Sequence, residues 1–216
     1  MMQEKIVVWG ASKHATVVAD IIRAQGLYDL IGFLDDLNPE RATESFCGAV
    51  ILGGREQLKL LKTRGVNHLI MAFGNNRGRL ALASLTREEG FDLARAIHPH
   101  AIIAAEVRIG AGTAVMGGAV LNSGVVVGDN AVINTGALIE HACTIGDGAL
   151  VNTGSRVGGN VIVGTAATIE IGATIGANLK IGSDSVIGAG SVVLRDVPEG
   201  VLAYGSPARV IRKISA

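Results

Sequence analysis

The chain has 216 residues, of which 49% are hydrophobic and only 3% aromatic, so aliphatic side chains must fill its core. Nineteen basic residues balance nineteen acidic ones, and this neutrality argues against a nucleic-acid-binding protein, which usually carries a basic excess. Cys47 and Cys143 lie far apart in the sequence, and we expect two reduced cysteines in a cytoplasmic protein. No stretch reads as a membrane helix.

Strands and helices alternate along the first part of the chain. The expected elements are, in chain order, a strand at 5–10, a helix at 13–25 with Ser12 as a candidate N-cap, a strand at 31–34, a helix at 55–64, a strand at 68–73 and a helix at 76–89. This alternation predicts a small α/β domain with a short parallel sheet over residues 1–96.

Polar and glycine residues follow each of the three expected strands, where open parallel sheets bind their ligands. The candidates for substrate binding are Gly10, Ser12, Lys13, His14, Asp35, Asp36, Asn75 and Arg77. The start of the first helix can hold a phosphate on its N–H groups, an acid can bind ribose hydroxyls, and an arginine can pair with a pyrophosphate. The three glycines of a dinucleotide fingerprint are missing, so NAD is not expected. A plain strand–helix turn, a solvated acidic turn and a surface arginine remain the alternatives.

A six-residue repeat occupies the rest of the chain. From Ile97 to Val193 every sixth residue is Ile, Val or Leu, seventeen times in succession, and the fourth residue after each is mostly small or aliphatic. This period fits neither a helix nor an open strand, but it fits a triangular coil with one short strand and one corner per hexad. We therefore expect coils of eighteen residues over 97–198, followed at 199–216 by a turn around Tyr204–Arg209 and a basic tail.

Five stretches of the sequence resemble the left-handed β-helix acyltransferases. Three lie in the repeat and after it, at 134–141, 188–193 and 205–208, and two lie at 10–15 and 32–36. The two N-terminal stretches are similar to the branch that acetylates nucleotide-linked sugars or sialic acid. The resemblance implies a left-handed coil, against the general right-handed rule for parallel crossovers. It also implies a homotrimer with active sites between subunits.

His141 is the only histidine between Ile103 and the C-terminus. It is the third residue of its hexad, so it should point outward near a corner, with Gly159 and Ser123 one coil away on either side. Neighbouring coils lie ~4.8 Å apart, and a glycine beside the imidazole would leave room for an acetyl thioester. An imidazole, with an unperturbed pKa of roughly 6.5, is suited to deprotonate an amine. The resemblance implies that His141 is the general base. The alternative is a solvated corner histidine.

The sequence departs from the family pattern at two positions. Some members place an acidic residue directly after this histidine, where this chain has Ala142, and a second histidine nine residues on, where it has Leu150. Another group must therefore orient the ring, and Glu140, Asn134, Asn152 or a backbone carbonyl are the candidates.

Coenzyme A should lie along the later coils, if the resemblance holds for its binding site. The expected contacts are Gly159, Ala177 and Ala189 near the corners, with Gly205, Ser206 and Pro207 around the adenine end. Arg209, Arg212 and Lys213 either attract its phosphates or are solvated surface charges.

The resemblance thus implies an enzyme that transfers an acetyl group from acetyl-CoA to the 4-amino group of a nucleotide-linked 4-amino-4,6-dideoxyhexose, with GDP-perosamine favoured and a UDP- or dTDP-linked sugar as a variant. The alternative acceptor is a hydroxyl, as in sialic acid O-acetylation. A zinc hydratase on the same coil would need three histidines on neighbouring coils, and the repeat has one, so no metal is expected. A non-catalytic scaffold is the remaining alternative.

Overall fold

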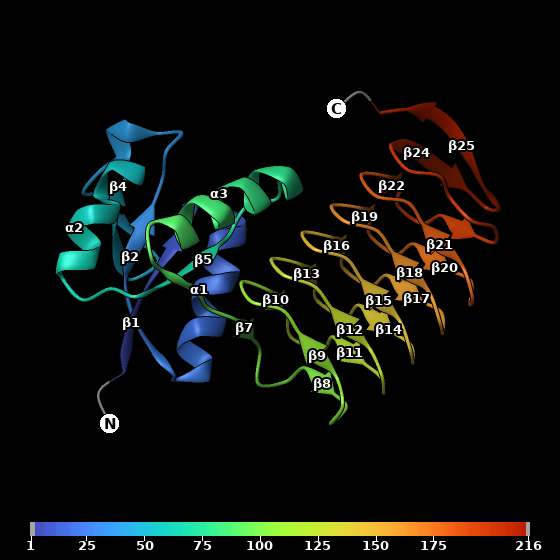
Figure 1. The fold of residues 1–216 in the computed structure, drawn as a ribbon, viewed down its shortest axis with the longest axis horizontal. Coiled ribbons are helices and arrows are strands. Elements are labelled where there is room, and N and C mark those ends of the chain that lie inside the picture. The colour runs from blue at the N-terminus through green and yellow to red at the C-terminus, as the bar shows by residue number, and fades with distance from the viewer. Residues whose placement is uncertain (1–2, 215–216) are drawn as a thin grey trace. The chain divides into compact units, whose positions relative to one another are not determined.

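The computed structural model describes residues 3–214. The chain divides into two compact units, one ending at Pro99 and the other beginning at His100 (Figure 1).

The first unit contains a six-stranded sheet in the order β3-β4-β2-β1-β5-β6. Its strands are β1 (Glu4–Trp9), β2 (Tyr28–Leu34), β3 (Ser45–Phe46), β4 (Ala49–Gly53), β5 (His68–Met71) and β6 (Asp92–Leu93), and β7 (Ala96–Ile97) follows them. Its helices are α1 (Lys13–Gln25), α2 (Leu58–Thr63) and α3 (Asn76–Glu88), with 3-10 turns at Pro39–Arg41 and Arg55–Gln57. All neighbouring strands run parallel except the β3–β4 hairpin.

Every strand and helix expected in this unit is present, and the structure adds β3, β4 and β6. β3 and β6 are only two residues long, too short to show a period in the sequence. The helix expected at 55–64 is divided into a 3-10 turn and α2. α1 forms because Val18, Ala19 and Ile22 bury one face, and it ends at Gly26, whose φ of 66° suits glycine. Ser12 precedes α1 in an extended conformation, but its side chain makes no capping hydrogen bond.

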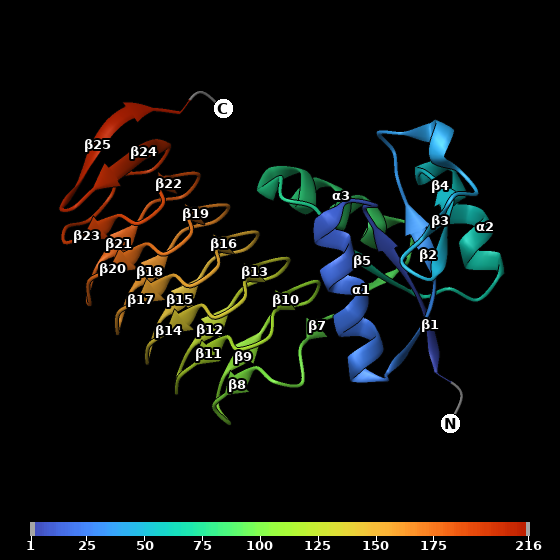
Figure 2. The ribbon, with the colours of Figure 1, turned by 180° about the vertical axis from the view of Figure 1, so that it is seen from behind.

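The second unit is a parallel β-helix of two-residue strands (Figure 2). The strands are β8 (Ile102–Ile103), β9 (Arg108–Ile109), β10 (Ala114–Val115), β11 (Val120–Leu121), β12 (Val126–Val127), β13 (Val132–Ile133), β14 (Leu138–Ile139), β15 (Thr144–Ile145), β16 (Leu150–Val151), β17 (Arg156–Val157), β18 (Ile162–Val163), β19 (Thr168–Ile169), β20 (Thr174–Ile175), β21 (Lys180–Ile181), β22 (Val186–Ile187) and β23 (Val192–Val193). Every third strand belongs to the same sheet, so three sheets form the three faces of the coil.

The hexad pattern explains this coil residue by residue. Each strand pairs with the strand eighteen residues later, as Ile139 does with Val157. The repeat residues from Val115 to Val193 are at most 2% exposed and form the core. The fourth residue of each hexad from Gly112 to Gly190 has a positive φ, and it is usually Gly, Asn or Asp, the residues that adopt this conformation at least cost.

Polar side chains are stacked along the corners of the coil. Asn134 donates to Asn152 at 2.9 Å, and Asn152 donates to Glu170 at 3.1 Å. On another corner the carboxylate of Asp147 accepts from the backbone N of Asp129 at 2.7 Å. These ladders give hydrogen-bond partners to polar groups that the turns would otherwise leave unpaired between coils.

The coil ends in an antiparallel hairpin of β24 (Val201–Gly205) and β25 (Ala208–Lys213). β24 pairs in parallel with β22, and the Ser206–Pro207 peptide in the turn is cis. The expected turn is present, but the segment that we expected to be a basic tail forms a strand. Five of the six residues of β25 are exposed, so its backbone pairing, rather than a buried face, makes it a strand.

Candidate active site

His141 lies at a corner of the coil two residues after the end of β14, as its place in the hexad predicts, and its side chain is exposed in the single chain. Its imidazole lies against Gly159 of the next coil. A Cβ atom at Gly159 would stand 2.7 Å from both Cε1 and Nε2 of the ring. The space that we expected to be open beside this glycine is therefore filled by the histidine itself.

No group among residues 3–214 forms a hydrogen bond with the imidazole of His141. Ala142 offers no carboxylate. Glu140 accepts from Asn122 at 3.1 Å, and Asn134 and Asn152 are bonded to each other in their ladder. The three side chains that we considered as orienting groups are thus bonded to other side chains within the chain.

The backbone around His141 is held firmly to the next coil. The carbonyl of His141 accepts from the N–H of Asn160 at 2.9 Å. Cys143 is fully buried, and its Sγ lies 3.1 Å from the carbonyl oxygen of Gly158, to which it donates. Burial raises the pKa of the Cys143 thiol, so the group stays protonated at neutral pH and is unsuited to act as a nucleophile.

A second cluster of candidates lies at the carboxyl ends of β1, β2 and β5 in the first unit. Gly10 follows β1 with a φ of 126°, and a Cβ there would stand 2.7 Å from the carbonyl oxygen of Ala72. Its N–H donates to the carbonyl of Leu34 at 2.8 Å. Gly10 is therefore required by a close approach of three strand ends, and this approach positions Ser12 and Lys13 at the start of α1.

The two acids after β2 are held by protein groups. Asp35 is 7% exposed and accepts from the backbone of Leu37 and from Asn38. Arg41 bridges the loops, because its Nη1 donates to the carbonyl of Ala11 at 2.9 Å and lies 3.3 Å from Asp35.

Asp36 accepts from the indole N–H of Trp9 at 3.0 Å and from the backbone N–H of Arg55 at 2.7 Å. Its side chain is 19% exposed, against 8% for that of Asp35, so it is the more accessible of the two acids.

The segment after β5 contains the predicted residues Asn75 and Arg77 and a third residue, Arg79, that was not predicted from the sequence. Asn75 caps α3 by accepting from the N–H of Gly78 at 2.8 Å, and Arg77 follows in the first turn. Arg79 is 1% exposed, and its Nη1 donates to the carbonyl of Phe73 at 3.0 Å. Burial lowers the pKa of Arg79 to about 10. The helical spacing could have predicted that Arg79 is buried, because it lies four residues before the buried Ala83 and so shares its helix face.

His14 belongs to the same edge of the sheet. Burial and the positive charge of Arg79 lower the pKa of its imidazole. Arg79 and His14 thus interact electrostatically at the helix start that we expected to hold a phosphate.

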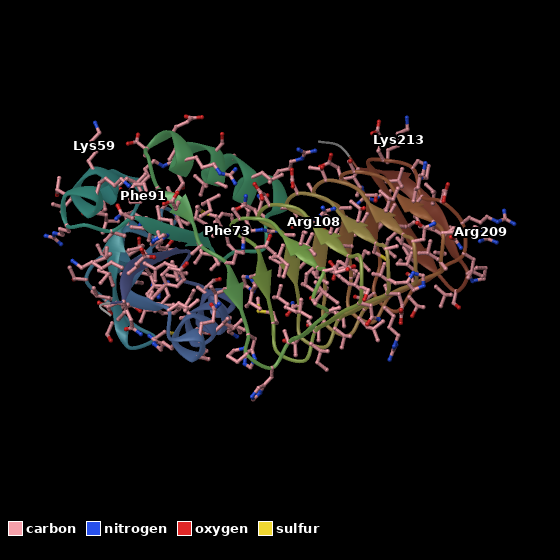
Figure 3. All side chains as sticks on the ribbon, turned by 60° about the horizontal axis from the view of Figure 1, so that its bottom comes forward. Lys59, Phe73, Phe91, Arg108, Arg209 and Lys213 are labelled. Atoms are coloured by element: carbon pink, nitrogen blue, oxygen red, sulfur yellow. The ribbon has the colours of Figure 1, made fainter. Side chains whose placement is uncertain are left out.

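The residues expected to bind coenzyme A lie on different parts of the coil. Gly159 and Ala177 are at one corner, eighteen residues apart, whereas Ala189 follows β22 at another corner. Gly205, Ser206 and Pro207 form the end of β24 and the hairpin turn. Arg209 and Lys213 project outward from β25 (Figure 3).

Two further features concern metal ions and membranes. Residues 3–214 contain no group of three or more His, Cys, Asp or Glu side chains placed to hold a metal ion. None of the described helices has the length and apolar character needed to cross a bilayer.

Comparisons with known proteins show which family this chain resembles. Residues 5–85 match the family model of the PglD N-terminal domain. The H141N mutant of perosamine N-acetyltransferase from Caulobacter crescentus, solved with CoA and GDP-perosamine, is 36% identical, with 97% of each chain covered and a TM-score of 0.90. The acetyltransferase domain of PglB from Neisseria gonorrhoeae is 32% identical, with 97% of this chain and 100% of that chain covered and a TM-score of 0.89. No curated protein sequence matches.

The similarity extends over both units of the chain. It confirms the expected fold, a small α/β domain followed by a left-handed parallel β-helix. Since a relative above 30% identity is matched along nearly its whole length, the resemblance noted in the sequence is also confirmed. The chain therefore belongs to the hexapeptide-repeat acetyltransferases, the family of acyltransferase enzymes that includes perosamine N-acetyltransferase and the acetyltransferase domain of PglB.

Proposed function

We propose that the protein transfers the acetyl group of acetyl-CoA to the 4-amino group of a nucleotide-linked 4-amino-4,6-dideoxyhexose, with GDP-perosamine as the favoured acceptor. The observation that supports this most directly is the place of His141, an exposed imidazole on a coil corner, in a chain that matches a GDP-perosamine-bound acetyltransferase over 97% of its length. The histidine replaced in that relative also has the number 141.

The proposed reaction is a direct transfer. An amino sugar is mostly an ammonium ion at neutral pH, and the imidazole of His141 removes the proton that prevents attack. The amine then attacks the carbonyl carbon of the thioester, the C–S bond breaks, and the coenzyme leaves as a thiol after taking up a proton. The backbone N–H of Gly159, for which residues 3–214 supply no acceptor, is the donor that we assign to the oxyanion.

The two substrates would occupy separate units. The carboxyl edge of the first unit would hold the nucleotide through the start of α1, with Lys13, His14, Asp36 and Arg77 around it. Coenzyme A would lie along the later coils, against Gly159, Ala177, Ala189 and the turn Gly205–Pro207. We further propose a homotrimer with active sites between subunits, because the residues proposed to bind the coenzyme lie on two corners of the coil of one chain. The cytoplasmic location stays a prediction.

A thiol-release assay with acetyl-CoA tests the reaction. GDP-, UDP- and dTDP-linked 4-amino sugars would be compared with matched sugars that carry a hydroxyl in place of the amine, and with sialic acid. We expect turnover with amino sugars and the highest kcat/KM with the GDP-linked one. Faster transfer to the hydroxyl sugars would support O-acetylation instead, and no turnover with any acceptor would support a scaffold.

Replacement of His141 tests the base. His141→Ala and His141→Asn should lower kcat by roughly 10²–10⁴-fold, the usual contribution of general base catalysis. Circular dichroism and the melting temperature should stay unchanged, because the side chain is exposed. Turnover near that of the unmodified protein in either variant would rule out this role.

A further inference from the structure

Gly159 differs from the glycines at the fourth hexad position of the coil. The glycines at the fourth hexad position, such as Gly124 and Gly154, have φ values of 74° and 66°, so the backbone conformation itself favours glycine there. Gly159 stands at the third hexad position, and its φ lies outside the left-handed region. Its backbone therefore accepts any L-residue, and some other constraint must explain the glycine.

That constraint is the imidazole of His141. The three atoms nearest to a Cβ built on Gly159 all belong to this ring, at 2.7 Å for Cε1, 2.7 Å for Nε2 and 3.3 Å for Cδ2. At Gly146 the three nearest atoms are all backbone atoms of the next coil, and at Gly128 and Gly188, where a side-chain atom lies nearest, backbone atoms are also among the three. Gly159 thus makes room for the side chain of His141, and not for the backbone of the next coil.

The two turns that meet at this contact are fixed to each other. The N–H of Asn160 binds the carbonyl of His141, and the thiol of Cys143 binds the carbonyl of Gly158. The Cα of Gly159 is therefore a rigid surface for the ring. Ala142 supplies no carboxylate and no group among residues 3–214 forms a hydrogen bond with the ring, so the contact with Gly159 is the constraint on the imidazole that the distances show.

We propose that Gly159 is a positioning residue for His141. Its missing side chain lets the imidazole lie against the neighbouring coil, and this contact sets the ring orientation that an acidic residue at position 142 would otherwise control. The inference rests on the proposed function, because it matters only if His141 is the general base.

Gly159→Ala isolates this contact. The added methyl group meets only the end of a rotatable side chain, so the ring should turn to another rotamer while the coil stays folded. Misplacing a catalytic group by ~1 Å can cost ~10²-fold in rate. We expect kcat to fall by about tenfold or more, with an unchanged melting temperature and a smaller change in the KM of either substrate.

A double-mutant cycle separates this role from simple clearance for the thioester. Gly159→Ala would be measured alone and together with His141→Ala. If Gly159 acts through the imidazole, the double variant should be no slower than His141→Ala alone. The pH profile of kcat should also lose its dependence on the imidazole in Gly159→Ala.

The outcomes are distinct. Normal kcat in Gly159→Ala, or an equal loss on top of His141→Ala, would overturn the inference and leave the proposed function standing. An active His141→Ala variant would instead refute the general base itself. If Gly159→Ala does not fold, recovery of folding in the double variant would support the ring contact, and continued misfolding would overturn it.

Discussion

Ala142 has a φ of 57°, in the left-handed region where a Cβ atom costs about 1–2 kcal/mol. The neighbouring corners use Gly124 or Gly136 at the equivalent position, and other corners use Asn or Asp. Ala142 therefore has a higher conformational cost than glycine at this φ, and it offers no charge to the imidazole. A substitution there tests how the ring is controlled.

Ala142→Asp should move the acidic limb of the kcat/KM profile to higher pH. Asp184 shows that an aspartate accepts this backbone conformation, with a φ of 58°. A carboxylate beside the ring favours the protonated imidazole, so a higher pH is then needed to free the base. Ala142→Asn supplies the same shape without the charge and is the control. The same profile for both variants would contradict an electrostatic effect.

Asp36→Ala should affect both stability and substrate binding. The change leaves the indole N–H of the buried Trp9 and the N–H of Arg55 without their acceptor, at a cost of about 1–3 kcal/mol. The KM for the sugar nucleotide should rise more than the KM for acetyl-CoA, which steady-state kinetics at a temperature well below unfolding would show. Equal increases would mean that Asp36 acts only on the fold.

At the scale of single elements, the corner ladders hold the coils in register. Asn152 accepts from Asn134 and from the N–H of Thr153, and it donates to Glu170. Three partners depend on this one side chain, which is half-buried. The ladder therefore couples three successive coils at one corner.

Asn152→Ala should lower the free energy of unfolding by about 1–3 kcal/mol, because its partners lose their hydrogen bonds. Asn122→Ala is the matched control, since Asn122 holds the same hexad position, is also half-buried and forms one ladder bond, at 3.1 Å to Glu140, so its replacement should cost less. Urea unfolding followed by circular dichroism gives both values. A loss for Asn122→Ala that equals or exceeds that of Asn152→Ala would show that the ladder adds little.

The elements also show how far sequence alone can reach. A strict period, such as the hexads around His141, predicts on which face or corner of the coil each residue lies. It also predicts which residue is its neighbour one coil away. The structure confirms both predictions for His141 and Gly159. Two-residue strands such as β3 have no period, because pairing with β4 alone makes them strands. The hydrogen bonds of Asp36 and the ring contact with Gly159 depend on side-chain directions, which no spacing rule provides.

For the molecule as a whole, stability should depend on pH through His14. Burial and the charge of Arg79 lower the pKa of this imidazole below its usual 6.5. Between the folded-state pKa and 6.5 the unfolded chain binds more protons, so stability rises with pH. The contribution is complete above pH 6.5 and is lost as the pH falls through the folded-state pKa. The carboxyl groups of Glu44 and Glu56, whose pKa values are lowered from 4.5, act in a more acidic range.

The first unit has its own optical probe for this effect. Trp9 is the only tryptophan and is 2% exposed, so its fluorescence reports the unfolding of that unit. The urea midpoint should fall as the pH is lowered from 7.5 to below 6.5, and His14→Gln should flatten this slope. An unchanged slope in the variant would mean that other groups cause it.

The eighteen-residue coil restricts how this protein can change in length. A duplication or loss of one whole circuit above or below the catalytic turns keeps each edge of the prism in line, and each repeat depends mainly on its nearest neighbours. A gain or loss of six residues between His141 and Gly159 would rotate the later edges by one third and carry the glycine away from the imidazole. Natural variation in the number of repeats should therefore occur in complete circuits, and any incomplete one should fall outside the interval between these two residues.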